Sequence, residues 1–117
     1  VGSEMCIRDR YNVETTPREF SSMVMLVRDA LLEMKKVLDY TGDVAANYMK
    51  MEARCRKIYV FEERGDEFYR EEIRRLFTEK QSAAYMIYWK DILVDVERML
   101  DAAAGAATLL QKLFVRV

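Results

Sequence analysis

After Pro17 the chain contains no proline, and this long uninterrupted stretch is the feature that most limits its fold. Proline ends or kinks helices and glycine weakens them, but the chain has one proline and only four glycines. Hydrophobic residues make up 51% of the sequence and charged residues 33%, which is typical of long amphipathic helices and poor for turn-rich sheets. We therefore expect an all-α fold.

The first of three predicted helices covers about residues 17–39. Thr16 is placed to cap it, with Pro17 at the first helical position and Glu19 reaching back as in a capping box. Gly42 is expected to close the helix in the left-handed conformation. Apolar residues at three- and four-residue steps predict one buried row: Phe20, Met23, Val24, Val27, Leu31, Met34 and Leu38.

The second and third predicted helices cover about residues 44–77 and 82–115. Asp43 is the expected N-cap of the second helix, which would span roughly 50 Å at 1.5 Å per residue. Its predicted core row is Val44, Tyr48, Met51, Cys55, Ile58, Glu62, Gly65, Tyr69, Ile73 and Leu76. The heptad-like row of the third helix is Tyr85, Trp89, Ile92, Val96, Met99, Ala103, Ala106, Leu110 and Leu113. Short connections favour consecutive helices that run in opposite directions, so we predict an elongated antiparallel three-helix bundle.

The first ten residues, VGSEMCIRDR, resemble the translated end of a transposase sequencing adapter read through in frame. We interpret residues 1–10 as a non-native segment that packs on nothing, and exclude them from fold reasoning. The natural sequence, residues 11–117, would then begin at Tyr11 as part of a longer reading frame. This interpretation leaves Cys55 as the single cysteine, which we expect in the core as a small apolar residue rather than as a reactive thiol.

The charge balance is close to neutral, with a formal net charge of −1. It therefore predicts no nucleic-acid partner, because such proteins carry a strong basic excess. Basic clusters at residues 54–57 and 70–75 are interleaved with glutamates, and we interpret them as solvated helix faces. No apolar run approaches the ~18 residues that indicate a membrane span.

Two pairs of acidic residues lie beside the predicted core rows: Glu62 with Asp66, and Glu97 with Asp101. Residues four apart share one helix face at a separation of roughly 6 Å, so both carboxylates of a pair can approach one cation. Gly65 lacks a side chain and would let an ion or another helix come close. Because the chain has no histidine, any ligand set is oxygen only, which favours Mg, Mn or ferric iron. The alternative is that neighbouring lysines and arginines neutralise these acids.

Motifs on the second and third helices occur in an order that resembles a known family. The segment FEERGDEFYR at residues 61–70 is similar to the family pattern E-x-x-G/A-D-x-x-Y-R, and Leu76-Phe77 is placed like its L-F helix end. The segment YWKDI at residues 88–92 resembles W-K-E-I. Glu97 and Asp101 stand in the position of L-E-x-x-x-D, with Val96 in place of the leucine. On these residues the chain from about residue 20 to residue 117 resembles the C-terminal half of the PhoU-like proteins, which are associated with Pit-type phosphate transporters.

This resemblance implies one three-helix repeat of a six-helix protein, and a role as an intracellular accessory or regulator of inorganic phosphate transport, without catalysis. It implies a cytoplasmic location, peripheral to the inner face of the membrane. The implied partners are a Pit-type membrane transporter, a missing N-terminal repeat and further copies of the chain. It also implies a cluster of metal ions, whether iron, manganese, zinc or magnesium, held by Glu62, Asp66, Glu97 and Asp101. Gly105 departs from the pattern, because the family usually has a further acid at that position.

Two other functions remain open from the sequence. The chain could be the cytoplasmic tail domain of a membrane phosphate transporter, or a plain helical scaffold whose acids are solvated. A di-iron carboxylate enzyme is disfavoured, because its sites need Glu-x-x-His pairs and this chain has no histidine. Three long helices whose outer stripe fits a further repeat would expose apolar surface, so we expect the isolated chain to self-associate or partly unfold.

Overall fold

The computed structural model describes residue 17, residues 19–79 and residues 81–115, and nearly all of these residues are helical, with no strand among them. The predicted all-α class is confirmed. Helix α2 spans Phe20–Asp39, the 3₁₀ turn η1 spans Tyr40–Asp43, α3 spans Val44–Thr78 and α4 spans Ala83–Phe114. The expectations for residues 1–10 and for the Thr16 cap fall outside the described residues.

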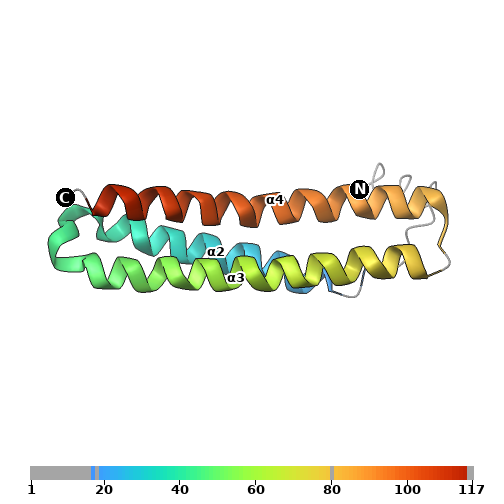
Figure 1. Cartoon of the computed structure of the whole chain (residues 1–117), viewed down its shortest axis with the longest axis horizontal. Helices are drawn as coiled ribbons and strands as arrows, with labels where there is room; N and C mark the ends of the chain where they lie inside the picture. The colour runs from blue at the N-terminus through green and yellow to red at the C-terminus, as the bar shows by residue number, and fades with distance from the viewer. Residues whose placement is uncertain (1–16, 18, 80, 116–117) are drawn as a thin grey trace, which may run out of the picture.

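The three helices lie side by side as a helical bundle, and each contacts the other two (Figure 1). The chain turns at η1 and again between α3 and α4, so α2 and α4 run in one direction and α3 in the other (Figure 1). With 35 residues, α3 is about 52 Å long at 1.5 Å per residue. None of the helices in the described part of the chain combines the length and the apolar character that a bilayer crossing requires.

Polar side chains begin α3 and α4. Asp43 accepts a hydrogen bond from the Ala46 N–H at 3.1 Å, as predicted for this N-cap. The hydroxyl of Ser82 accepts one from the Tyr85 N–H at 3.1 Å. Both contacts satisfy backbone donors that have no partner inside the helix.

The expected left-handed cap at Gly42 was wrong. The chain instead passes through the 3₁₀ turn η1, where Tyr40 keeps right-handed helical angles and the glycine stays outside the left-handed region. A right-handed 3₁₀ turn continues the helical sense of α2 and needs no glycine. Helix α2 also begins later than predicted, at Phe20, because the Pro17 carbonyl accepts from the Phe20 N–H in a single turn at 3.1 Å.

The core fills the space between the helices along their whole length. Cys55 is buried within it, as predicted, and burial raises the pKa of its thiol, with the negative charge of Glu52 adding to the effect. Aromatic packing fills one end, where Phe20 meets Trp89 edge-on at 5.1 Å between ring centroids. The apolar residues buried in the helices are Met23, Leu26, Val27, Ala30, Val37, Met51, Cys55, Ile58, Leu76, Tyr85, Trp89, Leu93, Leu100, Ala103, Ala107 and Phe114.

The predicted core rows of α2 and α4 were partly wrong, whereas that of α3 is largely buried. On α2, the predicted residues Val24, Leu31 and Leu38 are exposed, and Leu26, Ala30 and Val37 are buried instead. On α4, the predicted residues Met99, Ala106 and Leu113 are exposed, and Leu100, Ala107 and Phe114 are buried instead. Both helices carry apolar residues on two adjacent faces, so periodicity alone does not decide which face enters the core.

On α3, Gly65 is buried and packs against the Leu100 side chain of α4. A Cβ atom placed on Gly65 would lie 2.2 Å from Leu100 Cδ1 and 3.6 Å from its Cγ. Leu100 itself is only 1% exposed, so it has little room to move away. The absence of a side chain at residue 65 therefore leaves the room that the Leu100 side chain occupies.

We predict opposite effects for alanine at the two helical glycines. Gly65→Ala forces Leu100 to move, and overpacking of this kind costs about 1–3 kcal/mol, which exceeds the gain of up to about 1 kcal/mol from better helix propensity. Gly105→Ala meets nothing within 4 Å and should gain about 0.5–1 kcal/mol. Urea unfolding of both variants measures this difference. Equal stabilisation by both would contradict the close approach.

Candidate metal centre

Three carboxylates from two helices meet on the α3/α4 side of the bundle. Glu62 of α3 and Glu97 and Asp101 of α4 each offer one oxygen, and these oxygens lie within 4.8 Å of one another. Glu62 and Glu97 are partly buried, whereas Asp101 is exposed. The sequence pairs these acids along each helix, and the structure brings acids of the two helices together between α3 and α4.

Asp66, the fourth acid of the predicted set, lies beside this cluster with a basic partner of its own. Its carboxylate accepts from Arg70 Nη1 at 2.5 Å, one helical turn further along α3. Its negative charge nevertheless reaches the cluster, because it contributes to the raised pKa of both Glu62 and Glu97. We name Glu62, Asp66, Glu97 and Asp101 together the acidic cluster.

The packing of α4 against α3 explains why the acids are close. Glu97 stands between Leu93 and Leu100, which are both fully buried and hold this part of α4 against the core. Leu100 in turn sits against Gly65, three residues after Glu62 and one before Asp66. The packing of Leu100 against Gly65 thus lies beside both acidic pairs, between α3 and α4.

Burial, together with contacts among the acids, raises the pKa of two members of the cluster. The pKa of Glu97 rises to about 7, first because of burial, then through a hydrogen bond with Asp101 and the charges of Asp101, Asp66 and Glu62. Burial also raises the pKa of Glu62, followed by its hydrogen bond with Asp101 and by nearby negative charges. A hydrogen bond between two carboxyl groups needs a proton on one of them. With a pKa of about 7, Glu97 is protonated in about half of the molecules at neutral pH unless another positive charge replaces the proton.

The positive charge does not come from an ion pair in the described part of the chain, where no lysine or arginine lies within 4.0 Å of Glu62, Glu97 or Asp101. The alternative that basic neighbours neutralise the acids therefore applies to Asp66 alone. Gly105, one turn beyond Asp101, is exposed and adds no ligand.

The donor set suits a hard cation. Carboxylate oxygens bind magnesium and calcium at about 2.0–2.6 Å, so two oxygens on opposite sides of one ion lie about 4–5 Å apart. The oxygens of Glu62, Glu97 and Asp101 lie within 4.8 Å of one another, which is close enough for them to reach one such ion. A bound cation would relieve the repulsion that now raises the pKa of Glu97 and Glu62.

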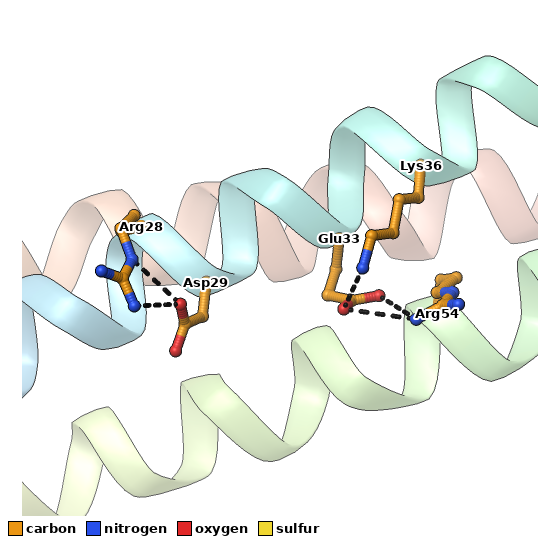
Figure 2. A network of polar contacts seen from close by, with 5 residues as sticks. All are labelled: Arg28, Asp29, Glu33, Lys36 and Arg54. Atoms are coloured by element: carbon orange, nitrogen blue, oxygen red, sulfur yellow. Dashed lines mark hydrogen bonds and ion pairs between the residues drawn. The ribbon is translucent and has the colours of Figure 1, made fainter.

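Two buried carboxylates elsewhere were missed from the sequence, and the first is Glu33 of α2. Figure 2 shows Glu33 directed toward α3, where Arg54 Nη1 donates to its two oxygens at 3.2 and 3.4 Å. Lys36 Nζ also lies 3.3 Å from a Glu33 oxygen (Figure 2). Arg28 pairs with Asp29 earlier in α2 (Figure 2). Arg54, which we had assigned to a solvated face, therefore neutralises a buried charge across two helices.

The second buried carboxylate, Glu72 of α3, is 2% exposed and stands at the start of α2. It accepts the Glu19 N–H at 3.2 Å and the Arg75 guanidinium at 2.8 Å. A carboxylate at a helix N-terminus satisfies a free backbone donor and is favoured by the helix dipole. The predicted core row passes through Tyr69 and Ile73 instead, but a seven-residue step from the buried Gly65 leads to Glu72, and this step is the sequence signal that could have marked it as buried. Both pairs have partners within the protein and are not candidates for ion binding.

Comparison with known proteins found no family model, no curated protein and no solved structure that matches this chain.

We predict that stability falls as pH rises through the pKa of Glu97. In the unfolded chain this group loses its proton near its ordinary pKa of 4.5, whereas the folded chain keeps it to about 7. The folded state thus binds more protons in this window, so the free energy of unfolding decreases between about pH 5 and pH 8 when a chelator is present. Glu97→Gln mimics the protonated form and should remove most of this slope.

The control for that measurement is Glu67→Gln, which removes one charge from an exposed residue of α3. It should keep the pH dependence of the parent chain in urea unfolding at a series of pH values. A parent slope that Glu97→Gln leaves unchanged would rule out the assigned role of this carboxyl group.

Proposed function

We propose that this chain is an accessory or regulatory protein of inorganic phosphate transport of the PhoU-like kind, acting by contact with a membrane transporter and holding metal ions on its acidic cluster. The observation that carries the proposal is that Glu62 of one E-x-x-x-D pair meets both acids of the other pair, Glu97 and Asp101, between neighbouring helices, with Asp66 close enough for its charge to raise the pKa of Glu97. The proposal includes an antiparallel three-helix repeat as the unit of a larger protein, a cytoplasmic location and no catalytic activity.

The residues of the cluster would have distinct roles toward a cation. Glu62, Glu97 and Asp101 already present three oxygens to a common point and lack basic partners among the described residues. Asp66 would join them by leaving or sharing its contact with Arg70. A bound cation would supply positive charge to the acidic cluster. The carboxylates would bind and orient it without a histidine or a thiolate.

The complete reading frame with its neighbouring genes tests the transport function. A preceding three-helix repeat with its own acidic motifs, or an adjacent gene for a Pit-type phosphate transporter, would support the proposal. Hydrophobic membrane segments directly upstream would favour a transporter's cytoplasmic tail domain instead. An unrelated upstream domain would contradict both.

We predict that metal binding depends on the acids of α3. Elemental analysis of the purified protein should find less metal in Glu62→Ala/Asp66→Ala than in the parent, because two of the four candidate ligands are lost. The matched control is Glu63→Ala/Glu67→Ala, which has the same spacing and charge change at exposed positions one residue along. Equal metal content in all three proteins would end the metal assignment while leaving the transport proposal to its own test.

We also predict that an acid at residue 105 strengthens the site. Gly105 lies one turn beyond Asp101, and a Cβ atom there would meet no atom within 4 Å. Gly105→Asp therefore adds a carboxylate next to Asp101 without a clash, and more ligand charge tightens binding of a hard cation. Isothermal titration with manganese should give a lower Kd than for the parent. The uncharged variant Gly105→Asn separates the effect of charge from that of the side chain's size.

A further inference from the structure

The two halves of α3 differ in charge. Residues 44–60 contain four cations and one acid, whereas residues 61–78 contain four cations and six acids. The one acid of the first half, Glu52, lies on the α4 side of the helix, where it accepts a hydrogen bond from Gln111 Nε2 at 3.2 Å. The first half of α3 therefore has an excess of positive charge.

Three of the four cations in this half have no acidic partner among the described residues. Arg54 pairs with Glu33 of α2 (Figure 2). In contrast, Lys50, Arg56 and Lys57 are exposed and form no ion pair with any acid that the structure describes. Their charges are therefore available to a partner from outside the chain.

The unpaired cations lie away from the core. At about 100° per residue, Arg56 lies about 160° around the helix from Ile58, which is fully buried. Lys50 and Lys57 lie nearer the edge, about 80° and 100° from Ile58. The Lys50 ammonium also lies 5.8 Å from the centre of the uncharged Tyr40 ring, a contact that leaves its charge in place.

Arg64 extends this line of cations. Lys50, Lys57 and Arg64 are each seven residues apart, and Arg64 is also exposed and without an ion pair to a described acid. Beyond it the outer side of α3 becomes acidic, because Glu63 and Glu67 are exposed there. The basic surface thus covers the part of α3 up to Arg64.

Two exposed apolar side chains lie among these cations. Met49 is 74% exposed and Val60 46% exposed, and they lie about 180° and 160° around the helix from Ile58. A solvated helix face has no need of apolar residues, whereas helices that lie in a membrane interface combine Lys and Arg with apolar side chains. We call this surface the basic face, formed by Met49, Lys50, Arg56, Lys57, Val60 and Arg64.

The shape of the basic face favours a lipid surface over a folded acidic protein. All its residues come from one helix, so the face is convex, and a protein partner would need a matching concave surface with acids at fixed positions. A bilayer adapts to a convex helix because its headgroups are mobile. Lys and Arg side chains are long enough to reach the headgroups while Met49 and Val60 enter the apolar boundary.

We propose that the basic face of α3 binds the surface of a membrane that contains anionic lipids. Headgroup phosphates and carboxylates supply the counter-charges of Lys50, Arg56, Lys57 and Arg64. The inference goes beyond the proposed function, since it uses no residue of the acidic cluster and holds whether or not the chain acts in phosphate transport. A soluble acidic protein is the competing partner.

Vesicle sedimentation with the full chain tests the proposal. A chelator is present throughout, so that divalent cations cannot link the acidic cluster to lipid headgroups. The chain should bind vesicles of equal parts phosphatidylserine and phosphatidylcholine, bind phosphatidylcholine vesicles at least about tenfold more weakly, and detach as the salt concentration rises. Failure of the parent chain to bind the mixed vesicles overturns the proposal.

Charge removal locates the surface. Lys50→Gln/Lys57→Gln should lower the partition coefficient on the mixed vesicles about 25-fold, because each cation near an anionic surface contributes about fivefold. The matched control is Arg74→Gln/Lys90→Gln, which makes the same change in net charge at exposed positions near the turn between α3 and α4. It should bind like the parent. Equal losses in the two variants would show that net charge alone governs binding and would rule out the basic face.

Met49→Ser separates a lipid partner from a soluble acidic one. It should weaken binding to the mixed vesicles but not to poly-L-glutamate, which offers negative charge without an apolar boundary. Because all the substituted positions are exposed, the variants should keep the helical circular dichroism of the parent. The lipid assignment is wrong if the parent binds poly-L-glutamate as tightly as the vesicles, or if Met49→Ser binds the vesicles like the parent.

Discussion

The contact between Gly65 and Leu100 is the constraint on which the candidate site depends. Helices usually keep side chains between their axes, and a glycine at the contact lets α4 approach α3 more closely than an alanine would. Because Glu62 and Asp66 lie on either side of this point, the approach brings their carboxylates to those of α4. The same packing that stabilises the core therefore creates the charge repulsion among the carboxylates of the acidic cluster.

The rotation of α2 depends on polar contacts rather than on hydrophobicity. Its apolar residues occupy two faces, with Leu26, Ala30 and Val37 buried and Val24, Leu31 and Leu38 exposed, so the hydrophobic pattern alone does not fix the rotation. Glu33 and Glu72 remove this ambiguity, since the first binds Arg54 across to α3 and the second binds the backbone at the start of α2. Breaking either contact would leave the buried carboxylate with one partner from its own helix, Lys36 for Glu33 and Arg75 for Glu72, and would remove the link to the neighbouring helix.

Local features of the sequence were predicted well, and relations between helices were not. Helix ends came within three residues because Asp43 and the proline-free stretches act locally. The buried faces of α2 and α4 were misplaced by one position, so that Leu100 rather than Met99 is in the core. The acids were predicted as two pairs, but whether the pairs meet depends on the spacing of α3 and α4. The Glu33–Arg54 contact depends on the rotation of α2 about its axis. Neither quantity is encoded in short-range periodicity.

Arg70, which forms an ion pair with Asp66, would compete with a bound cation for this fourth carboxylate of the acidic cluster. A cation that takes Asp66 exchanges one counter-charge for another instead of adding to an unpaired acid. The exchange releases the guanidinium of Arg70, whose side chain is already 66% exposed, toward solvent on the surface of α3. A cation bound at the acidic cluster would thus change the charge exposed on α3 one helical turn away, through the Arg70 side chain and without movement of the backbone.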